Sequence, residues 1–284
     1  MEFTSVGVVG SGVMAAGVAE VCAGAASSVT VRARSDSAAQ SLLAALDASL
    51  ARSVAKGRLD PDEAADLRRR VTVTTDLSSL AACQLVIESV VEEMSVKREL
   101  FDELDRVADA DAILATNTST LSVTDLAMET RRPERVCGLH FFNPAPVMPL
   151  VEVVRTLCVD DATIDAAEAF ARACGKEPIV VADRAGFVVN DLLFPYLNHA
   201  VRLLETGVAS REGIDQAMVG GCGFPMGPLA LLDLIGLDTA LAILSALHAE
   251  YSDAAYLPAP LLRRLVSTGR LGRKSGRGFY DYGD

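Results

Sequence analysis

The sequence predicts an α/β protein: a doubly wound, mainly parallel sheet of the Rossmann type, followed by a smaller all-helical domain. Short apolar segments alternate with longer amphipathic ones up to about residue 184, which is the pattern of a parallel sheet covered by helices on both faces. A glycine-rich turn follows the first apolar segment, and beyond residue 184 almost only helical patterns remain. We therefore expect one domain over residues 1–184 and a helical domain over residues 185–284.

The first elements are two strands around a helix. Residues 3–9 are apolar as in a buried strand, residues 13–25 are rich in alanine, and residues 29–32 are β-branched. A long helix is expected over residues 36–56, because its leucines recur at helical spacing and form one apolar face, Leu42, Leu43, Leu46 and Leu50.

The first domain then continues with the same alternation. Asp60 and Pro61 supply the N-cap acceptor and the first-turn proline of another helix. Three more strands are expected, over residues 71–75, 85–88 and 113–116, and a helix over residues 95–108 separates the last two.

The second domain is expected to be helical throughout. Residues 187–248 carry helical patterns that are interrupted by glycine and proline at residues 220–228. A further helix over residues 258–268 leads into a glycine-rich tail.

The composition excludes several classes of protein. The 284 residues carry a formal net charge of −12, so nucleic acid and anionic membranes are not expected partners, since both are bound by basic patches. No apolar run reaches the roughly 20 residues of a membrane span, and the N-terminus lacks a secretion signal. Six scattered cysteines and only three histidines indicate reduced thiols in the cytoplasm and no metal centre.

The glycine-rich turn has the G-x-G-x-x-A pattern of dinucleotide sites. Its residues, Gly10-Ser-Gly12-Val13-Met14-Ala15, end the first strand and begin the first helix, which is the context that this fingerprint requires. Gly10 permits the tight turn, and Gly12 lets the backbone approach a pyrophosphate. The helix N-terminus offers it N–H groups and a partial positive charge. The alternative is a glycine-rich turn that binds nothing.

The end of the second strand departs from an ordinary NAD site. Such sites have Asp or Glu there to accept hydrogen bonds from the ribose hydroxyls, whereas Ala33 occupies that position here. Arg34 and Ser35 follow, and a guanidinium suits a 2′-phosphate. We expect NAD(P) as the cofactor, with NADP(H) favoured over NAD(H). The alternative is a surface arginine beside an NAD site that lacks its acid.

His140 and Glu152 are the candidate acid–base pair. His140 ends an apolar segment, and Glu152 lies inside the next β-rich segment. Imidazole is the side chain best suited to exchange protons near neutrality. If the two segments are neighbouring strands, Glu152 holds the ring and favours its charged form. A turn histidine bonded to a carbonyl is the alternative.

The chain resembles the L-3-hydroxyacyl-CoA dehydrogenases, most closely the short bacterial 3-hydroxybutyryl-CoA dehydrogenases. The resemblance covers essentially the whole chain. Beside the glycine-rich turn it is carried by Thr116-Asn-Thr-Ser119, His140-Phe-Phe-Asn-Pro-Ala-Pro-Val-Met, Gly186-Phe-Val-Val-Asn190, Pro225-Met-Gly-Pro228 and Leu271-Gly-Arg-Lys-Ser-Gly-Arg-Gly-Phe-Tyr280.

The resemblance implies an enzyme that interconverts 3-hydroxyacyl and 3-ketoacyl thioesters with a nicotinamide cofactor. His140 matches the family's proton carrier and Glu152 its partner. Ser119 matches the hydroxyl that bonds the substrate oxygen, and Asn190 the amide that positions the substrate. A helix N-cap for Ser119 and a capping or interdomain bond for Asn190 are the structural alternatives.

The resemblance also implies binding residues. Four match positions that contact the cofactor, namely Glu92, Lys97, Asn143 and Lys274, and solvated surface charge is their alternative role. Three match the region that holds the thioester handle, namely Ser49, Arg52 and Lys56; the two cations, four residues apart on one helix face, suit the phosphates of coenzyme A.

The substrate and the assembly remain open between alternatives. The helical domain is expected to close the substrate cleft and to form a homodimer. The same chemistry on an acyl-carrier-protein thioester, such as a polyketide extender unit, is the first alternative. A nucleotide-binding protein without catalysis is the second.

Overall fold

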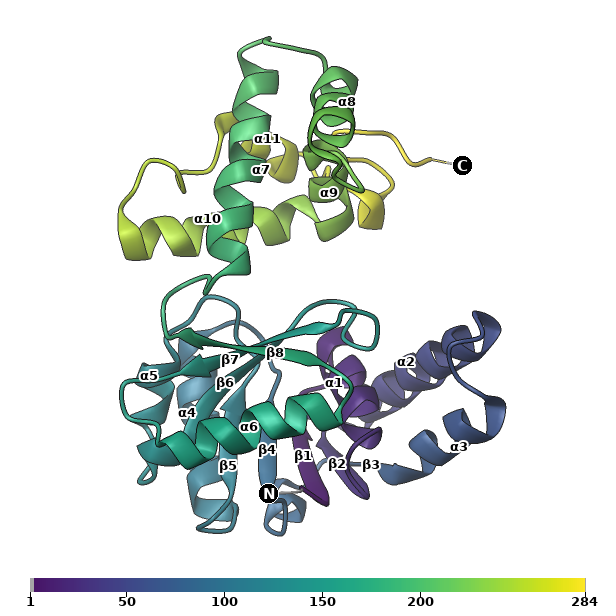
Figure 1. Ribbon diagram of the computed structural model, residues 1–284, viewed down its shortest axis with the longest axis vertical. Coiled ribbons are helices and arrows are strands. Elements are labelled where there is room, and N and C mark those ends of the chain that lie inside the picture. The colour runs from purple at the N-terminus through teal and green to yellow at the C-terminus, as the bar shows by residue number, and fades with distance from the viewer. Residues whose placement is uncertain (1–2, 284) are drawn as a thin grey trace. The chain divides into compact units, whose positions relative to one another are not determined.

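The computed structural model describes residues 3–283. They divide between Asp183 and Arg184 into two compact units, both drawn in Figure 1. The sequence placed the boundary one residue later. We describe each unit by itself.

The first unit is built on one eight-stranded sheet with the order β3-β2-β1-β4-β5-β6-β7-β8. Every neighbouring pair is parallel except β6 and β7, which are antiparallel. The predicted mainly parallel, Rossmann-type sheet is thus confirmed. The strands are β1 (Ser5–Val9), β2 (Ser28–Arg32), β3 (Val71–Thr74), β4 (Leu85–Glu88), β5 (Ile113–Thr116), β6 (Val136–Phe141), β7 (Leu150–Arg155) and β8 (Glu177–Ala182).

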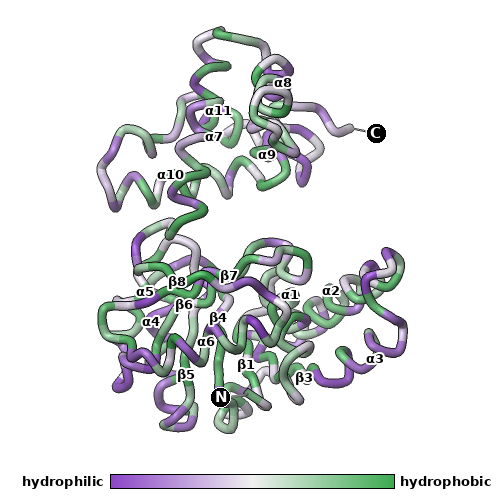
Figure 2. Tube along the Cα trace, viewed as in Figure 1, coloured by the Kyte–Doolittle hydropathy of each residue, from purple (hydrophilic) through white to green (hydrophobic). Residues whose placement is uncertain are grey.

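Helices cover both faces of this sheet, as Figure 1 shows. One face packs against α1 (Val13–Ala23), α2 (Asp36–Ala55) and α6 (Asp161–Ala173). The other packs against η1 (Leu77–Leu80), α4 (Met94–Val107) and α5 (Val123–Ala127). The central strands β1, β4, β5 and β6 are therefore buried on both faces, which explains why they are apolar nearly throughout; Figure 2 shows hydrophobic colour at β1, β4 and β5.

Side chains cap two of the helices whose start the sequence predicted, α2 and α3 (Pro61–Arg70). The Ser35 hydroxyl accepts from the Ala38 amide at the start of α2. The Asp60 carboxylate accepts from the Asp62 amide at the start of α3, a polar helix on which Figure 2 shows mainly hydrophilic colour. These bonds satisfy N–H groups that have no partner within the helix. The remaining short element is η2 (Pro133–Arg135).

The second unit is helical, as expected. It contains α7 (Val189–Glu205), α8 (Arg211–Cys222), α9 (Pro228–Ile235), α10 (Leu237–Tyr251), α11 (Pro260–Ser267) and η3 (Arg273–Ser275). Their apolar faces form a core of their own around Leu197, Leu232 and Leu244. No single helix among the described residues is long and apolar enough to cross a membrane; only α9 and α10 pass that test as a pair, and they are bent by 97°.

A buried carboxylate fixes the glycine-rich tail of the second unit. Asp233, at the end of α9, is 1% exposed. Its oxygens accept from the amides of Phe279 and Tyr280 at 2.9 and 2.8 Å and from the Tyr282 hydroxyl at 3.1 Å. A side chain on Gly278 would collide with this carboxylate. The tail needs its glycine there because the chain passes directly over Asp233.

The two residues at the boundary are anchored in different units. The Asp183 carboxylate accepts from the amides of Val123 and Thr124 at the start of α5, at 3.0 and 2.6 Å. The Arg184 guanidinium lies over the Tyr251 ring, 5.3 Å from its centre. Asp183 thus caps a helix of the first unit, while Arg184 makes a cation–π contact within the second.

Candidate active site

The turn between β1 and α1 leaves room for a phosphate group. Gly10 has a φ of +145°, and a Cβ there would collide with the Ser89 carbonyl. A Cβ built on Gly12 would meet nothing within 4 Å. Gly12 is also the N-cap of α1, without a side-chain cap and without an acidic residue in the first turn. Val13 is exposed and Met14 partly exposed at the start of this helix, whereas Ala15 is fully buried. The open helix start at Gly12 and Val13 fits a pyrophosphate.

The turn lies at the switch point of the sheet. The chain crosses from β3 at one edge to β4 beside β1, and ligands of open α/β sheets bind at the carboxyl ends of the strands at such a point. Beyond β2, Ala33 is fully buried and Arg34 is exposed. Ser35 caps α2 with its hydroxyl, so that Arg34 is the exposed cation at this end.

His140 and Glu152 face each other across the antiparallel strands β6 and β7. The two residues are register partners, and His140 Nδ1 lies 2.7 Å from Glu152 Oε2. The histidine is 6% exposed and the glutamate is fully buried. Because Nδ1 bonds to the carboxylate, the ring orientation is fixed from one side. The Phe142 ring lies 4.5 Å from the His140 ring, centre to centre.

A glycine lets the two strands approach each other beside this pair. Gly138 is two residues before His140 on the same face of β6. A Cβ at Gly138 would come within 2.6 Å of two carbons of its register partner, Val154. The position next to the acid–base pair is therefore filled by Val154, with a methyl of Val123 at 3.4 Å from the same Cβ position.

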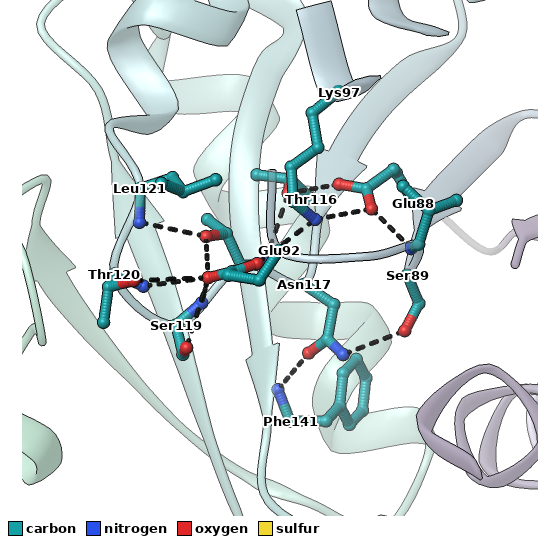
Figure 3. Close-up of polar contacts among 12 residues, drawn as sticks. Glu88, Ser89, Glu92, Lys97, Thr116, Asn117, Ser119, Thr120, Leu121 and Phe141 are labelled. Atoms are coloured by element: carbon teal, nitrogen blue, oxygen red, sulfur yellow. Dashed lines mark hydrogen bonds and ion pairs between the residues drawn. The ribbon is translucent and has the colours of Figure 1, made fainter. Parts of the chain in front are cut away.

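Ser119 lies in a loop that wraps around the carboxylate of Glu92 (Figure 3). Glu92 Oε1 accepts from the Ser119 amide at 2.8 Å and from the Ser119 hydroxyl at 3.2 Å. It also accepts from the Thr118 hydroxyl at 2.6 Å and from the Thr120 amide at 3.2 Å. Burial raises the pKa of Glu92, but the Lys97 charge and the bonds from Thr118 and Ser119 outweigh it, so that this pKa lies below its usual range. The carboxylate therefore remains ionised at neutral pH.

Lys97 and Glu88 form a buried ion pair behind this loop. They are 1% and 0% exposed, and Lys97 Nζ lies 2.6 Å from Glu88 Oε1 and 3.4 Å from Glu92 Oε2. The ammonium is thus shared by two carboxylates. The sequence assigned Lys97 and Glu92 to the cofactor; that contact stays a prediction, and the structure adds the internal bonds that both make.

Asn117 ties the Ser119 loop to the strand of His140, as Figure 3 shows. Its Oδ1 accepts from the Phe141 amide at 2.8 Å, and its Nδ2 donates to the Ser89 hydroxyl at 3.2 Å. One amide therefore links the carboxyl ends of β4, β5 and β6.

The other residues predicted for binding are spread over the molecule. Asn143 is exposed after β6, and Ser49, partly exposed, and Arg52 and Lys56, both exposed, lie at the end of α2. In the second unit, Asn190 is buried in the first turn of α7, and Lys274 Nζ lies 2.6 Å from the Asp238 carboxylate. His140, Glu152, Ser119 and the glycine-rich turn all belong to the first unit, at the strand ends that form the carboxyl edge of its sheet.

Sequence reasoning did not assign a role to Glu88 or Asn117. Glu88 is the charged last residue of an apolar strand, and Asn117 stands within the Thr116-Asn-Thr-Ser119 motif. Charged side chains are rarely buried without a partner. A glutamate at the end of an apolar strand was therefore the signal in the sequence that could have pointed to a buried ion pair at Glu88.

The fold and the site together define a two-domain, nucleotide-dependent dehydrogenase. A dinucleotide turn at the switch point, with an acid–base pair at the same edge of the sheet, is an arrangement suited to hydride and proton transfer. Comparison with known proteins identifies the family of this dehydrogenase. Residues 5–184 match the 3-hydroxyacyl-CoA dehydrogenase NAD binding domain, and residues 186–282 match the 3-hydroxyacyl-CoA dehydrogenase C-terminal domain. The chain belongs to the 3-hydroxyacyl-CoA dehydrogenase family and is an oxidoreductase.

Individual relatives match over nearly their full length. The 3-hydroxybutyryl-CoA dehydrogenase of Mycobacterium tuberculosis is 49% identical over 279 residues, which are 98% of each chain. The crystal structure of M. tuberculosis FadB2 superposes with a TM-score of 0.98 at 48% identity, and the match covers 100% of both chains. That of (S)-3-hydroxybutyryl-CoA dehydrogenase PaaH1 from Ralstonia eutropha gives 0.93 at 42% identity, covering 99% of this chain and 100% of the other.

Proposed function

We propose that this enzyme interconverts 3-hydroxyacyl-CoA and 3-ketoacyl-CoA thioesters, with the 3-hydroxybutyryl chain as its substrate. The observation that carries the proposal is the buried His140–Glu152 pair, whose Nδ1 and Oε2 are 2.7 Å apart, at the edge of the sheet where the dinucleotide turn lies. The names of the relatives at 43–49% identity agree with this substrate.

His140 carries the proton in the proposed mechanism. Bound NAD(P) supplies the hydride acceptor for oxidation and the hydride donor for reduction at substrate C3. As the C3–H bond breaks in oxidation, His140 Nε2 takes the proton of the C3 hydroxyl, and in reduction it returns that proton to the C3 oxygen. Glu152 holds the ring through Nδ1 and balances the charge that the imidazolium gains.

The other predicted residues bind the substrate and the cofactor in the proposed mechanism. The Ser119 hydroxyl donates to the C3 oxygen as negative charge develops on it, and Asn190 positions the thioester. Ser49, Arg52 and Lys56 bind the phosphate-bearing handle, for which two exposed cations at the end of α2 are suited. Four residues contact the cofactor: Glu92, Lys97, Asn143 and Lys274.

We also propose NADP(H) as the preferred cofactor. Ala33 offers no carboxylate to the 2′-hydroxyl, and its absence removes repulsion against a 2′-phosphate. Arg34 is exposed at the same strand end and can pair with that phosphate. The ratio of kcat/KM for NADPH and NADH tests this, and a clear preference for NADH would overturn it.

A homodimer formed through the second unit is the proposed assembly. Large apolar side chains are exposed on that unit, namely Leu192, Val219, Phe224 and Leu234, and such side chains are common in subunit interfaces. Sedimentation equilibrium tests this proposal, since a monomer at micromolar concentration would contradict it.

One assay tests the reaction. Purified enzyme is given acetoacetyl-CoA with NADPH and with NADH, and the loss of absorbance of the reduced cofactor is followed. We expect turnover with the CoA thioester. Activity on acetoacetyl-acyl-carrier protein alone would transfer the proposal to a carrier-bound substrate, and no activity on either would refute it.

A further inference from the structure

We propose that Glu88 is a positioning residue for Ser119, acting through the buried Lys97 and Glu92. The inference rests on the proposed function, because Ser119 is the residue whose placement matters for catalysis. Glu88 itself is fully buried at the end of β4, so that its effect on the reaction must pass through other side chains.

Two chains of bonds lead from the Glu88 carboxylate to the Ser119 loop. In the first, Oε1 holds Lys97 Nζ at 2.6 Å, Lys97 lies 3.4 Å from Glu92, and Glu92 accepts from the Ser119 amide at 2.8 Å. In the second, Oε2 accepts from the Thr116 hydroxyl at 2.6 Å, and the Thr116 oxygen accepts from the Thr118 amide at 3.2 Å. Figure 3 labels the residues of the first route and, of the second, Glu88 and Thr116.

Further hydrogen bonds restrict the positions of Glu88 and Thr118. Glu88 Oε1 also accepts from the Val90 amide at 2.6 Å, which fixes the carboxylate to the backbone after β4. The Thr118 hydroxyl donates to Glu92 and accepts from the Leu121 amide at 3.0 Å. The amides of Thr118, Ser119 and Thr120 are all held, which fixes the serine Cα, and the Ser119 hydroxyl itself bonds to Glu92 at 3.2 Å.

Stability alone does not account for a charged pair in this position. Burying two charges costs about as much as their attraction returns, and apolar side chains of similar volume often replace such pairs without loss. The pair here instead provides the shared cation that keeps Glu92 ionised and oriented. We therefore assign it to the geometry of the loop.

A double-mutant cycle separates positioning from general stability. Glu88→Gln preserves the shape of the side chain but leaves Lys97 with one carboxylate. In the native background we expect kcat to fall about tenfold to a hundredfold, and in a Ser119→Ala background less than about twofold, because the hydroxyl that Glu88 positions is then missing. Equal effects of Glu88→Gln in both backgrounds would overturn the proposal, as would an unchanged kcat.

A matched control, Asp105, lies on α4, the helix that carries Lys97. Asp105 of α4 is buried and bonds to Arg131 and Arg132, with both Nε–carboxylate distances at 2.8 Å, but it does not bond to the Ser119 loop. Asp105→Asn is expected to lower the melting temperature while kcat stays within about twofold. A loss of kcat equal to that of Glu88→Gln would show that α4 stability alone controls the reaction and would refute the positioning role.

Two further measurements keep the test decisive. If Glu88→Gln does not fold, the neutral pair Glu88→Gln/Lys97→Met replaces it. We expect its melting temperature to be restored but its kcat to remain low, and recovery of both would overturn the proposal.

Amide hydrogen exchange at Ser119 and Thr120 can be measured without enzymatic activity, and we expect it to speed up about tenfold or more in Glu88→Gln. Faster exchange in an enzyme without turnover on any thioester would refute the proposed function while retaining the positioning; unchanged exchange would refute the positioning itself.

Discussion

His140 and Glu152 are direct partners in an antiparallel strand pair, so that the pairing register itself brings imidazole and carboxylate together. The two strands are joined directly by residues 142–149. His140→Ala is expected to lower kcat by about two to four orders of magnitude while the cofactor still binds, because the proton carrier is lost. Glu152→Gln should cause a smaller loss.

The control for that prediction is His199→Ala, which changes an exposed histidine of α7. Steady-state assays and circular dichroism of all three variants give activity and folding. A His140→Ala enzyme with more than about a tenth of native activity would contradict the proton-transfer role.

The glycine-rich turn should separate binding from stability. Gly12→Ala places a methyl group in open space, so we expect an unchanged melting temperature and a dissociation constant for the cofactor raised tenfold or more, because the methyl occupies the phosphate position. Gly10→Ala should instead unfold the protein more readily, since its φ of +145° and the Ser89 carbonyl exclude a side chain. Fluorescence titration and thermal melts distinguish them. Equal melting temperatures for the two variants would be inconsistent with this turn.

Cofactor choice should depend on Arg34. We expect Arg34→Ala to lower kcat/KM for NADPH about tenfold or more and to leave the value for NADH unchanged, because a guanidinium–phosphate bond is lost only with the former. Arg58→Ala, another exposed arginine of the same unit, is the control and should change neither value. A parallel loss with both cofactors would argue against a 2′-phosphate contact.

The tail of the second unit should depend on Asp233. Asp233→Ala leaves the buried Phe279 amide, the partly buried Tyr280 amide and the Tyr282 hydroxyl without their acceptor, and each buried unsatisfied group costs roughly 1–3 kcal/mol. We expect urea denaturation to show a loss of roughly 3 kcal/mol or more, whereas Asp281→Ala, at an exposed ion pair, should lose little. Similar midpoints for both variants would refute the role of Asp233.

Thiol reactivity should follow burial. Burial raises the pKa of Cys137 to about 12, so that at pH 8 almost none of it is the reactive thiolate. Cys158 and Cys222 are exposed. We expect iodoacetamide to modify these two in the native enzyme and Cys137 only after unfolding. Peptide mass mapping reads out each site, and early modification of Cys137 would contradict the buried strand position.

Most of the fold could be predicted because each segment carries its own pattern. The leucine spacing of α2 and the Asp60-Pro61 start of α3 are local properties, and the structure has both helices at those places. The strand β8 was not predicted: it begins with Glu177 and Pro178, and most of its side chains are exposed. Its apolar run, Ile179-Val-Val-Ala182, is short, and a short apolar run does not by itself distinguish a strand from a helix. Its pairing with β7 supplies what its sequence does not.

The site was predictable to the extent that it depends on motifs. The His140 segment and the glycine-rich turn are recognisable from the amino-acid sequence alone, and the two lie at one edge of the sheet. The bonds that connect Glu92 with Ser119 and Lys97 with Glu88 depend instead on how β4, β5 and α4 align. A charge in a sequence does not show its partner, and Lys97 was therefore expected at the cofactor while its ammonium also forms an internal pair.

The anchoring of Asp183 and Arg184 has a consequence for recombination between related genes. Because each of these adjacent residues makes its contact inside its own unit, a crossover between their codons would transfer every such contact intact to the chimaera. The peptide bond between them is thus a natural junction for exchanging one half of the enzyme with that of a relative.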